Sequence, residues 1–165
     1  LAYVGLSINR DVNSPIDVIN AAGSKTALVV YQPGLSSFPR DVSYAFANGL
    51  AASGWRVELT TASSQAQSDL FNYSLLVLGF PIYGASPGTA IVRYIDRLSN
   101  LHGINVVIVA CAAGSPGDSV DTMKQKAQAA GGTFKGSITL FSMAPNEGNG
   151  TATDIARQYG TQILP

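Results

Sequence analysis

The chain has 165 residues, enough for one domain with a substantial hydrophobic core. Hydrophobic residues make up 46% and charged residues 12%, well below the usual ~25%, so we expect a globular protein whose surface is rich in uncharged polar groups. Ten basic and ten acidic residues cancel, and no run of Lys or Arg occurs, which argues against a nucleic-acid partner.

Residues 1–24 are interpreted as an N-terminal extension. Residues 1–8 are apolar, but they fall far short of the ~20 residues that span a bilayer, so no direct membrane span is expected. The run ends abruptly at Asn9, which fits the remnant of a removed signal or anchor segment, and a short edge strand fits equally well. Ser14 followed by Pro15 predicts a short helix over residues 15–22.

Residues 25–165 form the main domain, in which strand and helix patterns follow one another. Continuous apolar runs predict buried strands, and the alternation over residues 55–60 predicts a strand at or near a sheet edge. The predicted strands are 26–31, 55–60, 75–79, 105–111 and 136–141. The predicted helices are 39–53, one marked by Ile91, Ile95 and Leu98, 119–130, and one capped by Thr151 with Asp154 in an imperfect capping box.

Alternation of strands and helices along the chain predicts a parallel sheet with right-handed crossovers and helices on both faces. Ligands of such sheets bind beyond the carboxyl ends of the strands, at the switch point of the strand order. The loops that follow Tyr31, Gly79 and Cys111 are therefore the candidate site.

The loop of residues 31–39 leads into the N-terminus of a helix, where backbone N–H groups and the helix dipole favour an anion. It is rich in hydroxyl and amide groups and contains no Lys. Its spacing is neither G-x-G-x-x-G nor that of a Walker loop, so dinucleotide and ATP binding lose their main support. A plain strand-to-helix turn is the alternative interpretation.

The second and third loops differ in what they offer a ligand. Residues 79–88 break a buried strand with Gly and Pro around Tyr83, a ring that either packs in the protein or lies flat against a planar ligand. Residues 111–118 are small and glycine-rich, which lets the backbone approach a ligand closely.

Single residues exclude several other chemistries. Cys111 is the only cysteine, so there is no intrachain disulfide or cysteine-built metal site, and we expect it to be a buried small hydrophobe. His102 is the only histidine, and its place beside Gly103 in an apparent turn predicts an ordinary surface residue.

The second loop carries a family resemblance. Its pattern Gly79-x-Pro-x-Tyr-Gly resembles the G-S-P-x-Y-G signature of flavodoxins and related FMN-binding proteins. The order of elements from Lys25 to about Ile163 is similar to that family as well, which implies a flavodoxin-like three-layer α/β fold with a doubly wound, five-stranded parallel sheet. The resemblance further implies that Ser36 and Ser37 lie on the loop that binds the FMN phosphate and that Tyr83 stacks on the flavin ring.

The resemblance implies FMN-binding residues in all three loops: Gln32, Gly34, Leu35, Ser36, Ser37, Phe38, Pro81, Ile82, Tyr83, Gly84, Ala112, Ala113 and Gly114. One position departs from the family pattern, because Pro39 stands where the phosphate loop T-G-x-T has its last Thr, which removes a hydroxyl and a backbone donor. Gln32 and Arg40 are candidates to compensate.

The function implied by the resemblance is electron transfer through bound FMN, with redox proteins as partners and no catalytic residue required. Two alternatives stay open: an FMN-dependent NAD(P)H:quinone-type reductase, and a module that has kept the fold and lost the flavin. The family implies a cytoplasmic location, whereas a removed N-terminal anchor would imply attachment to a membrane.

Overall fold

The computed structural model describes residues 11–165, so the apolar run over residues 1–8 and its interpretation lie outside the described residues. The strands are β1 (Asp17–Ile19), β2 (Thr26–Tyr31), β3 (Arg56–Thr61), β4 (Leu75–Tyr83), β5 (Ser86–Pro87), β6 (Asn105–Ala112) and β7 (Thr133–Phe141). The helices are α2 (Phe38–Ala52), α3 (Thr89–Arg97), α4 (Ser119–Ala129) and α5 (Ala152–Thr161). Within the described part of the chain, no helix combines the length and apolarity needed to cross a membrane.

The sheet has the strand order β1-β3-β2-β4-β6-β7. The five predicted strands are present, and their four neighbouring pairs are all parallel. Two short strands add to them, since β1 pairs antiparallel with β3 and β5 pairs antiparallel with the end of β4. From β2 the chain moves outward to β3 and then returns to β4 on the other side of β2, so the switch point lies between β2 and β4.

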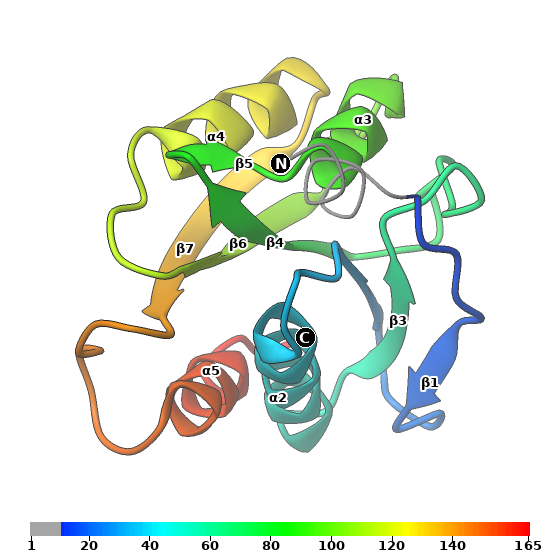
Figure 1. Cartoon of the computed structure of the whole chain (residues 1–165). Helices are drawn as coiled ribbons and strands as arrows, with labels where there is room; N and C mark the ends of the chain where they lie inside the picture. The colour runs from blue at the N-terminus through cyan, green and yellow to red at the C-terminus, as the bar shows by residue number, and fades with distance from the viewer. Residues whose placement is uncertain (1–10) are drawn as a thin grey trace.

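Helices cover both faces of the sheet, with α3 and α4 on one side and α2 and α5 on the other (Figure 1). Successive side chains of a strand point to opposite faces. In β2, Leu28 and Val30 therefore join the core under α3 and α4, while Ala27 and Val29 join the core under α2 and α5. All four are fully buried, which explains why this strand is a continuous apolar run.

The predicted helix over residues 15–22 is wrong, because this segment forms strand β1 instead. The hydroxyl of Ser14 does not cap a helix; it accepts a hydrogen bond from Thr61 N at 3.2 Å. Asn20, at a φ of 53°, then turns the chain toward β2. The open edge of β3 pairs with Asp17–Ile19, and this pairing outweighs the local Ser-Pro signal.

The crossover from β3 to β4 contains no helix, in contrast to the other crossovers of the sheet. Residues 62–74 run as an irregular segment that buries Ala62, Ala66 and Leu70 in the core on the α3 side. An irregular segment of this length needs its own polar contacts to keep it in place.

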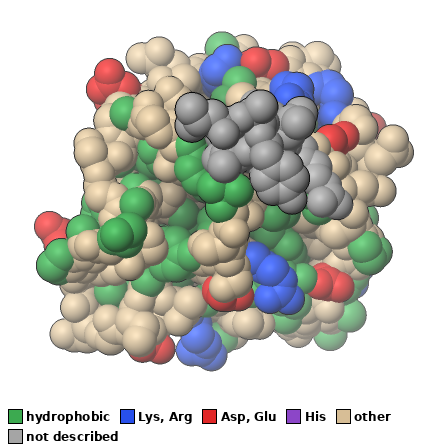
Figure 2. Space-filling view, viewed as in Figure 1, with side chains coloured by type: hydrophobic (Ala, Val, Ile, Leu, Met, Phe, Trp, Pro, Cys, Tyr) green, Lys and Arg blue, Asp and Glu red, His purple; other side chains and the backbone are tan. Residues whose placement is uncertain are grey.

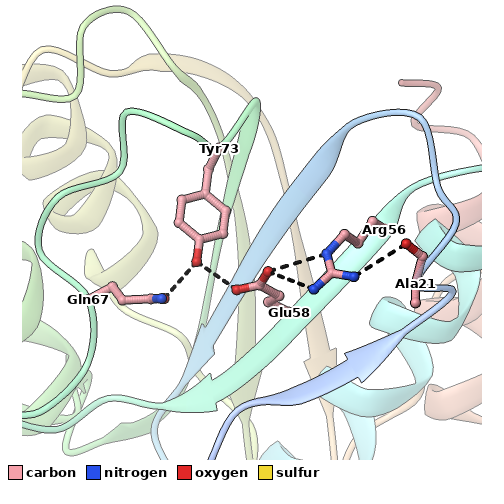
Figure 3. Close-up of polar contacts among 5 residues, drawn as sticks. All are labelled: Ala21, Arg56, Glu58, Gln67 and Tyr73. Carbon is pink, nitrogen blue, oxygen red and sulfur yellow. Dashed lines mark hydrogen bonds and ion pairs between the residues drawn. The ribbon is translucent and has the colours of Figure 1, made fainter.

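A polar network supplies those contacts (Figure 3). The Tyr73 hydroxyl donates to Glu58 Oε1 at 2.7 Å and also lies 2.8 Å from the Gln67 side-chain amide. Glu58 Oε2 in turn lies 3.3 Å from Arg56 Nη2, and Arg56 Nη1 donates to the Ala21 carbonyl at 3.3 Å. The crossover, strand β3 and the N-terminal segment are thus joined by one chain of hydrogen bonds.

We expect Tyr73→Phe to lower the free energy of unfolding by about 1–2 kcal/mol at neutral pH, because the largely buried Glu58 carboxylate loses a donor. Burial, followed by the hydrogen bond to Glu58, raises the pKa of Tyr73. Its stabilising contribution is therefore fully present below pH ~10, the pKa of an unfolded tyrosine, and is lost as the pH rises further. Urea denaturation from pH 7 to 11 checks both points, since the variant should lose less stability above pH ~10.

Tyr44→Phe is the matched control for the value at neutral pH, because its hydroxyl bonds Asp17 at the exposed surface. A loss in Tyr44→Phe as large as that in Tyr73→Phe would contradict a special role for the crossover network.

Candidate functional site

The three loops at the carboxyl ends of β2, β4 and β6 meet at the switch point and enclose a cavity of about 250 Å³. Its lining residues are Leu35, Ser36, Phe38, Pro39, Pro81, Ile82, Tyr83, Cys111, Ala112, Ala113 and Ser142. Every loop singled out from the sequence contributes to this lining, and the loop after β7 contributes Ser142 in addition. The cavity lies where ligands of doubly wound sheets bind.

Eight of the predicted site residues line this cavity, and five do not. Gly34 precedes the lining residue Leu35 in the chain. Ser37, Gly84 and Gly114 are exposed residues of the same three loops. Gln32 serves another element: it is 1% exposed, and its Oε1 accepts a hydrogen bond from Ile91 N at 3.0 Å in the first turn of α3. Its amide therefore holds α3 against the end of β2.

Three lining residues were absent from the predicted set. Pro39 was identified as a departure from the family pattern, and Cys111 as a core residue. Ser142 follows β7, whose neighbour in the sheet is β6, and its N–H donates to the Ala112 carbonyl at 2.9 Å. The strand order supplies the signal for Ser142, because loops after neighbouring parallel strands lie at the same edge.

The first loop packs closely around Gly34. A Cβ atom at Gly34 would lie 2.8 Å from Pro39 Cγ and 2.9 Å from Tyr83 Oη, so only glycine fits between these two side chains. The next residue, Leu35, donates its backbone N–H to Tyr83 Oη at 2.8 Å. Ser36 Oγ accepts from Phe38 N at 3.3 Å, which leaves its own hydroxyl hydrogen available to a ligand.

The cavity is electrically neutral. None of the described residues that line it has a charged side chain. Figure 2 shows the charged side chains of the viewed face as small separate groups among broad hydrophobic and uncharged areas. Arg40 lies one residue beyond Pro39, but its guanidinium contacts Asp41 at 3.4 Å and lies 4.8 Å above the Tyr44 ring. The N-terminus of α2 is therefore the source of positive potential that remains near the first loop among the described groups.

The two titratable side chains of the cavity stay protonated at neutral pH. Burial raises the pKa of the Cys111 thiol to about 12, as expected for a thiol that is 4% exposed. Burial also raises the pKa of Tyr83, and the hydrogen bond from Leu35 N counteracts only part of this effect. Neither group is therefore a general base at neutral pH.

The first glycine of the resemblance motif has a packing role. A Cβ atom at Gly79 would lie 2.6 Å from Ser43 Oγ and 3.1 Å from Tyr31 Cβ. Gly79 thus lets α2 approach β4 closely at the switch point. Among the buried side-chain polar atoms of residues 11–165, Ser43 Oγ alone has no hydrogen-bond partner, and it sits against this glycine.

Larger hollows occur elsewhere, but they lie away from the switch point. One of about 440 Å³ lies between the crossover and α3, and Arg97 donates there to the carbonyls of Ser63 and Ala66 at 3.1 and 2.6 Å. Its basic side chain thereby anchors the crossover. No cluster of side chains suited to a metal ion occurs among the described residues.

Comparison with known proteins identifies the fold. No protein-family model and no curated protein sequence matches the chain. Among solved structures, a flavodoxin from the domain Archaea aligns with a TM-score of 0.67 at 17% identity, over 83% of this chain and 94% of its own. Megasphaera elsdenii flavodoxin gives 0.67 at 18% identity, over 83% and 99%. An NAD(P)H:quinone oxidoreductase from Methanothermobacter marburgensis gives 0.55 at 14%, over 84% and 92%. The chain therefore has the flavodoxin-like fold predicted from its sequence.

We expect Gly79→Ala to destabilise the protein by about 1–3 kcal/mol, because the added methyl group overpacks the contact between α2 and β4. Combining it with Ser43→Ala should restore much of the loss, since Ser43 Oγ is the atom that the methyl group meets first. Ser43→Ala alone should be neutral or stabilising, because it removes a buried hydroxyl without a partner. Urea denaturation of the four proteins measures this coupling. Strictly additive effects would show that the two residues do not meet as described.

Proposed function

We propose that this protein binds one FMN molecule non-covalently in the cavity between the three loops and transfers electrons to and from redox partner proteins. The observation that carries the proposal is the convergence of these loops at the switch point, beside the N-terminus of α2. Helix N-termini bind phosphate groups through N–H groups and the helix dipole. Flavin nucleotides combine such a phosphate with a planar ring, and Tyr83 offers an aromatic face in the same cavity.

The chemistry of the donor set fits FMN. On the phosphate side, the Ser36 and Ser37 hydroxyls and the Leu35 N–H are neutral donors at the start of α2. On the ring side, Ala112 and Ala113 are small, so the backbone of the third loop is accessible to a flat ligand. The cavity of about 250 Å³ is slightly smaller than the ~300–1,000 Å³ of complete ligand pockets. A bound flavin would therefore reach the mouth of the cavity, which electron exchange with another protein requires.

The cavity lining indicates which roles belong to the cofactor and which to the protein chain. FMN, when bound, supplies the redox chemistry, and the chain supplies binding, orientation and exclusion of water. Electron transfer is favoured over a reductase because none of the described groups that line the cavity is a general base at neutral pH. Pro39 also has a defined role here, since its ring packs against Gly34 and shapes the first loop.

We expect purified protein, or apoprotein given FMN, to hold one FMN per chain. Titration of apoprotein into FMN should quench the flavin fluorescence to a one-to-one endpoint, because the ring becomes enclosed beside Tyr83. ADP, which carries phosphate but no flavin ring, is the control ligand and should not compete at equal concentration. Absence of quenching at high micromolar protein would contradict the proposal. Rapid bleaching of the bound flavin by NADPH alone would favour the reductase over the electron carrier.

The phosphate should be held by neutral groups. Replacing Ser36 and Ser37 together by Ala should weaken FMN binding by about 1.5–3 kcal/mol and leave riboflavin, which lacks the phosphate, almost unaffected. Arg40→Ala should weaken FMN binding by at most about 1 kcal/mol, because its guanidinium is engaged in an exposed ion pair with Asp41.

Calorimetric titrations with both flavins measure these effects. Replacing Ser68 and Ser99, two exposed serines outside the cavity lining, provides a matched control. Equal losses for FMN and riboflavin in the Ser36/Ser37 double variant would show that the first loop does not bind the phosphate.

A further inference from the structure

A hydrogen bond from a backbone N–H to a side-chain hydroxyl joins the first and second loops at the cavity. It runs from the Leu35 backbone N–H, at the approach to α2, to Tyr83 Oη at the end of β4, over 2.8 Å. Both residues line the cavity, and Gly34 is confined between the same hydroxyl and Pro39. The Tyr83 hydroxyl oxygen therefore accepts the hydrogen bond of a backbone N–H in the loop that precedes the N-terminus of α2.

The Leu35 N–H is one of the donors near this helix start that an anion could use. The described lining residues include no Lys or Arg, so backbone N–H groups and serine hydroxyls are the partners they offer. The Leu35 N–H has a single hydrogen, and strong hydrogen bonds to Tyr83 and to a ligand oxygen exclude each other. A phosphate oxygen is the stronger acceptor, because hydrogen bonds to charged groups are shorter and about twice as strong as neutral ones.

We propose that Tyr83 is a positioning residue whose hydroxyl stands in for the ligand phosphate, keeping the Leu35 N–H bonded in the ligand-free protein and yielding it when FMN binds. This inference rests on the proposed function and deepens it. The hydroxyl keeps this exposed N–H bonded within the protein in place of water. Phosphate binding then releases the hydroxyl, and the aromatic ring is no longer tied to the first loop. A flavin without phosphate leaves the Tyr83–Leu35 bond in place.

As a consequence, loss of the Tyr83 hydroxyl should raise the affinity for FMN, whereas loss of its aromatic ring should lower it. Tyr83→Phe removes the competing acceptor and keeps the aromatic ring, so FMN should bind about two- to tenfold more tightly than to the natural chain. Riboflavin affinity should stay within about twofold. If the hydroxyl instead contacts the ligand, or holds the loop in its binding shape, the same variant binds FMN more weakly.

The experiment combines calorimetric titration of FMN and riboflavin with amide hydrogen exchange of Leu35 measured by NMR in the ligand-free protein. Tyr83→Trp is the second variant, which also lacks the hydroxyl and retains an aromatic ring. Tyr73→Phe is the matched control: it loses a hydroxyl at the amino-end side of β4, away from the cavity. We expect Leu35 exchange to be several-fold faster in both Tyr83 variants and unchanged in the control.

The outcomes separate this inference from the proposed function. Faster Leu35 exchange together with tighter FMN and unchanged riboflavin supports it. Unchanged Leu35 exchange, unchanged or weaker FMN binding in Tyr83→Phe, or an equal gain for riboflavin overturns it while leaving FMN binding itself intact. Failure of FMN to bind the natural chain and all variants overturns the proposed function, and this inference with it.

Discussion

Helix α2 packs closely against the sheet where β4 has no side chain, at Gly79, and the geometry of the cavity depends on this contact. On its other side α2 meets α5 through two further glycines: a Cβ atom at Gly49 would lie 2.1 Å from the Arg157 carbonyl, and one at Gly160 would lie 2.4 Å from the Phe46 carbonyl. The helix is thus held between sheet and neighbouring helix by backbone contacts that tolerate little displacement. Its N-terminus, and the first loop with it, is fixed beside the switch point.

Because none of the described residues that line the cavity is charged, hydrogen bonding to an anion there would fall to backbone N–H groups and hydroxyls. An anion held there relies on N–H groups and hydroxyls, and these same groups need partners when the anion is absent. The first loop meets this need internally, through Ser36 Oγ for the Phe38 N–H and Tyr83 Oη for the Leu35 N–H.

The main fold was predictable because its strands are buried on both faces. Leu28 to Val30, for example, pack under helices on either side of the sheet, so an apolar run of strand length identifies β2 without knowledge of its neighbours. Strand β1 was not predictable in this way, since Ile16 and Val18 are 42% and 46% exposed and the segment becomes a strand through pairing with β3. Local signals at Ser14 and Pro15 favoured a helix, and a long-range backbone partner decided otherwise.

At the site, the sequence located the loops but did not separate packing from ligand contact within them. Gly79 and Gln32 belong to the predicted loops, yet Gly79 serves the contact of α2 with β4, and Gln32 holds α3. Distinguishing such roles needs the distances between elements far apart in the chain. The Tyr83 hydroxyl, in contrast, lies beside Gly34 at the edge of the cavity. Packing alone would therefore preserve Gly79 in a chain that binds nothing. The proposal that the site binds a ligand rests on the donors of the first loop rather than on the glycine motif.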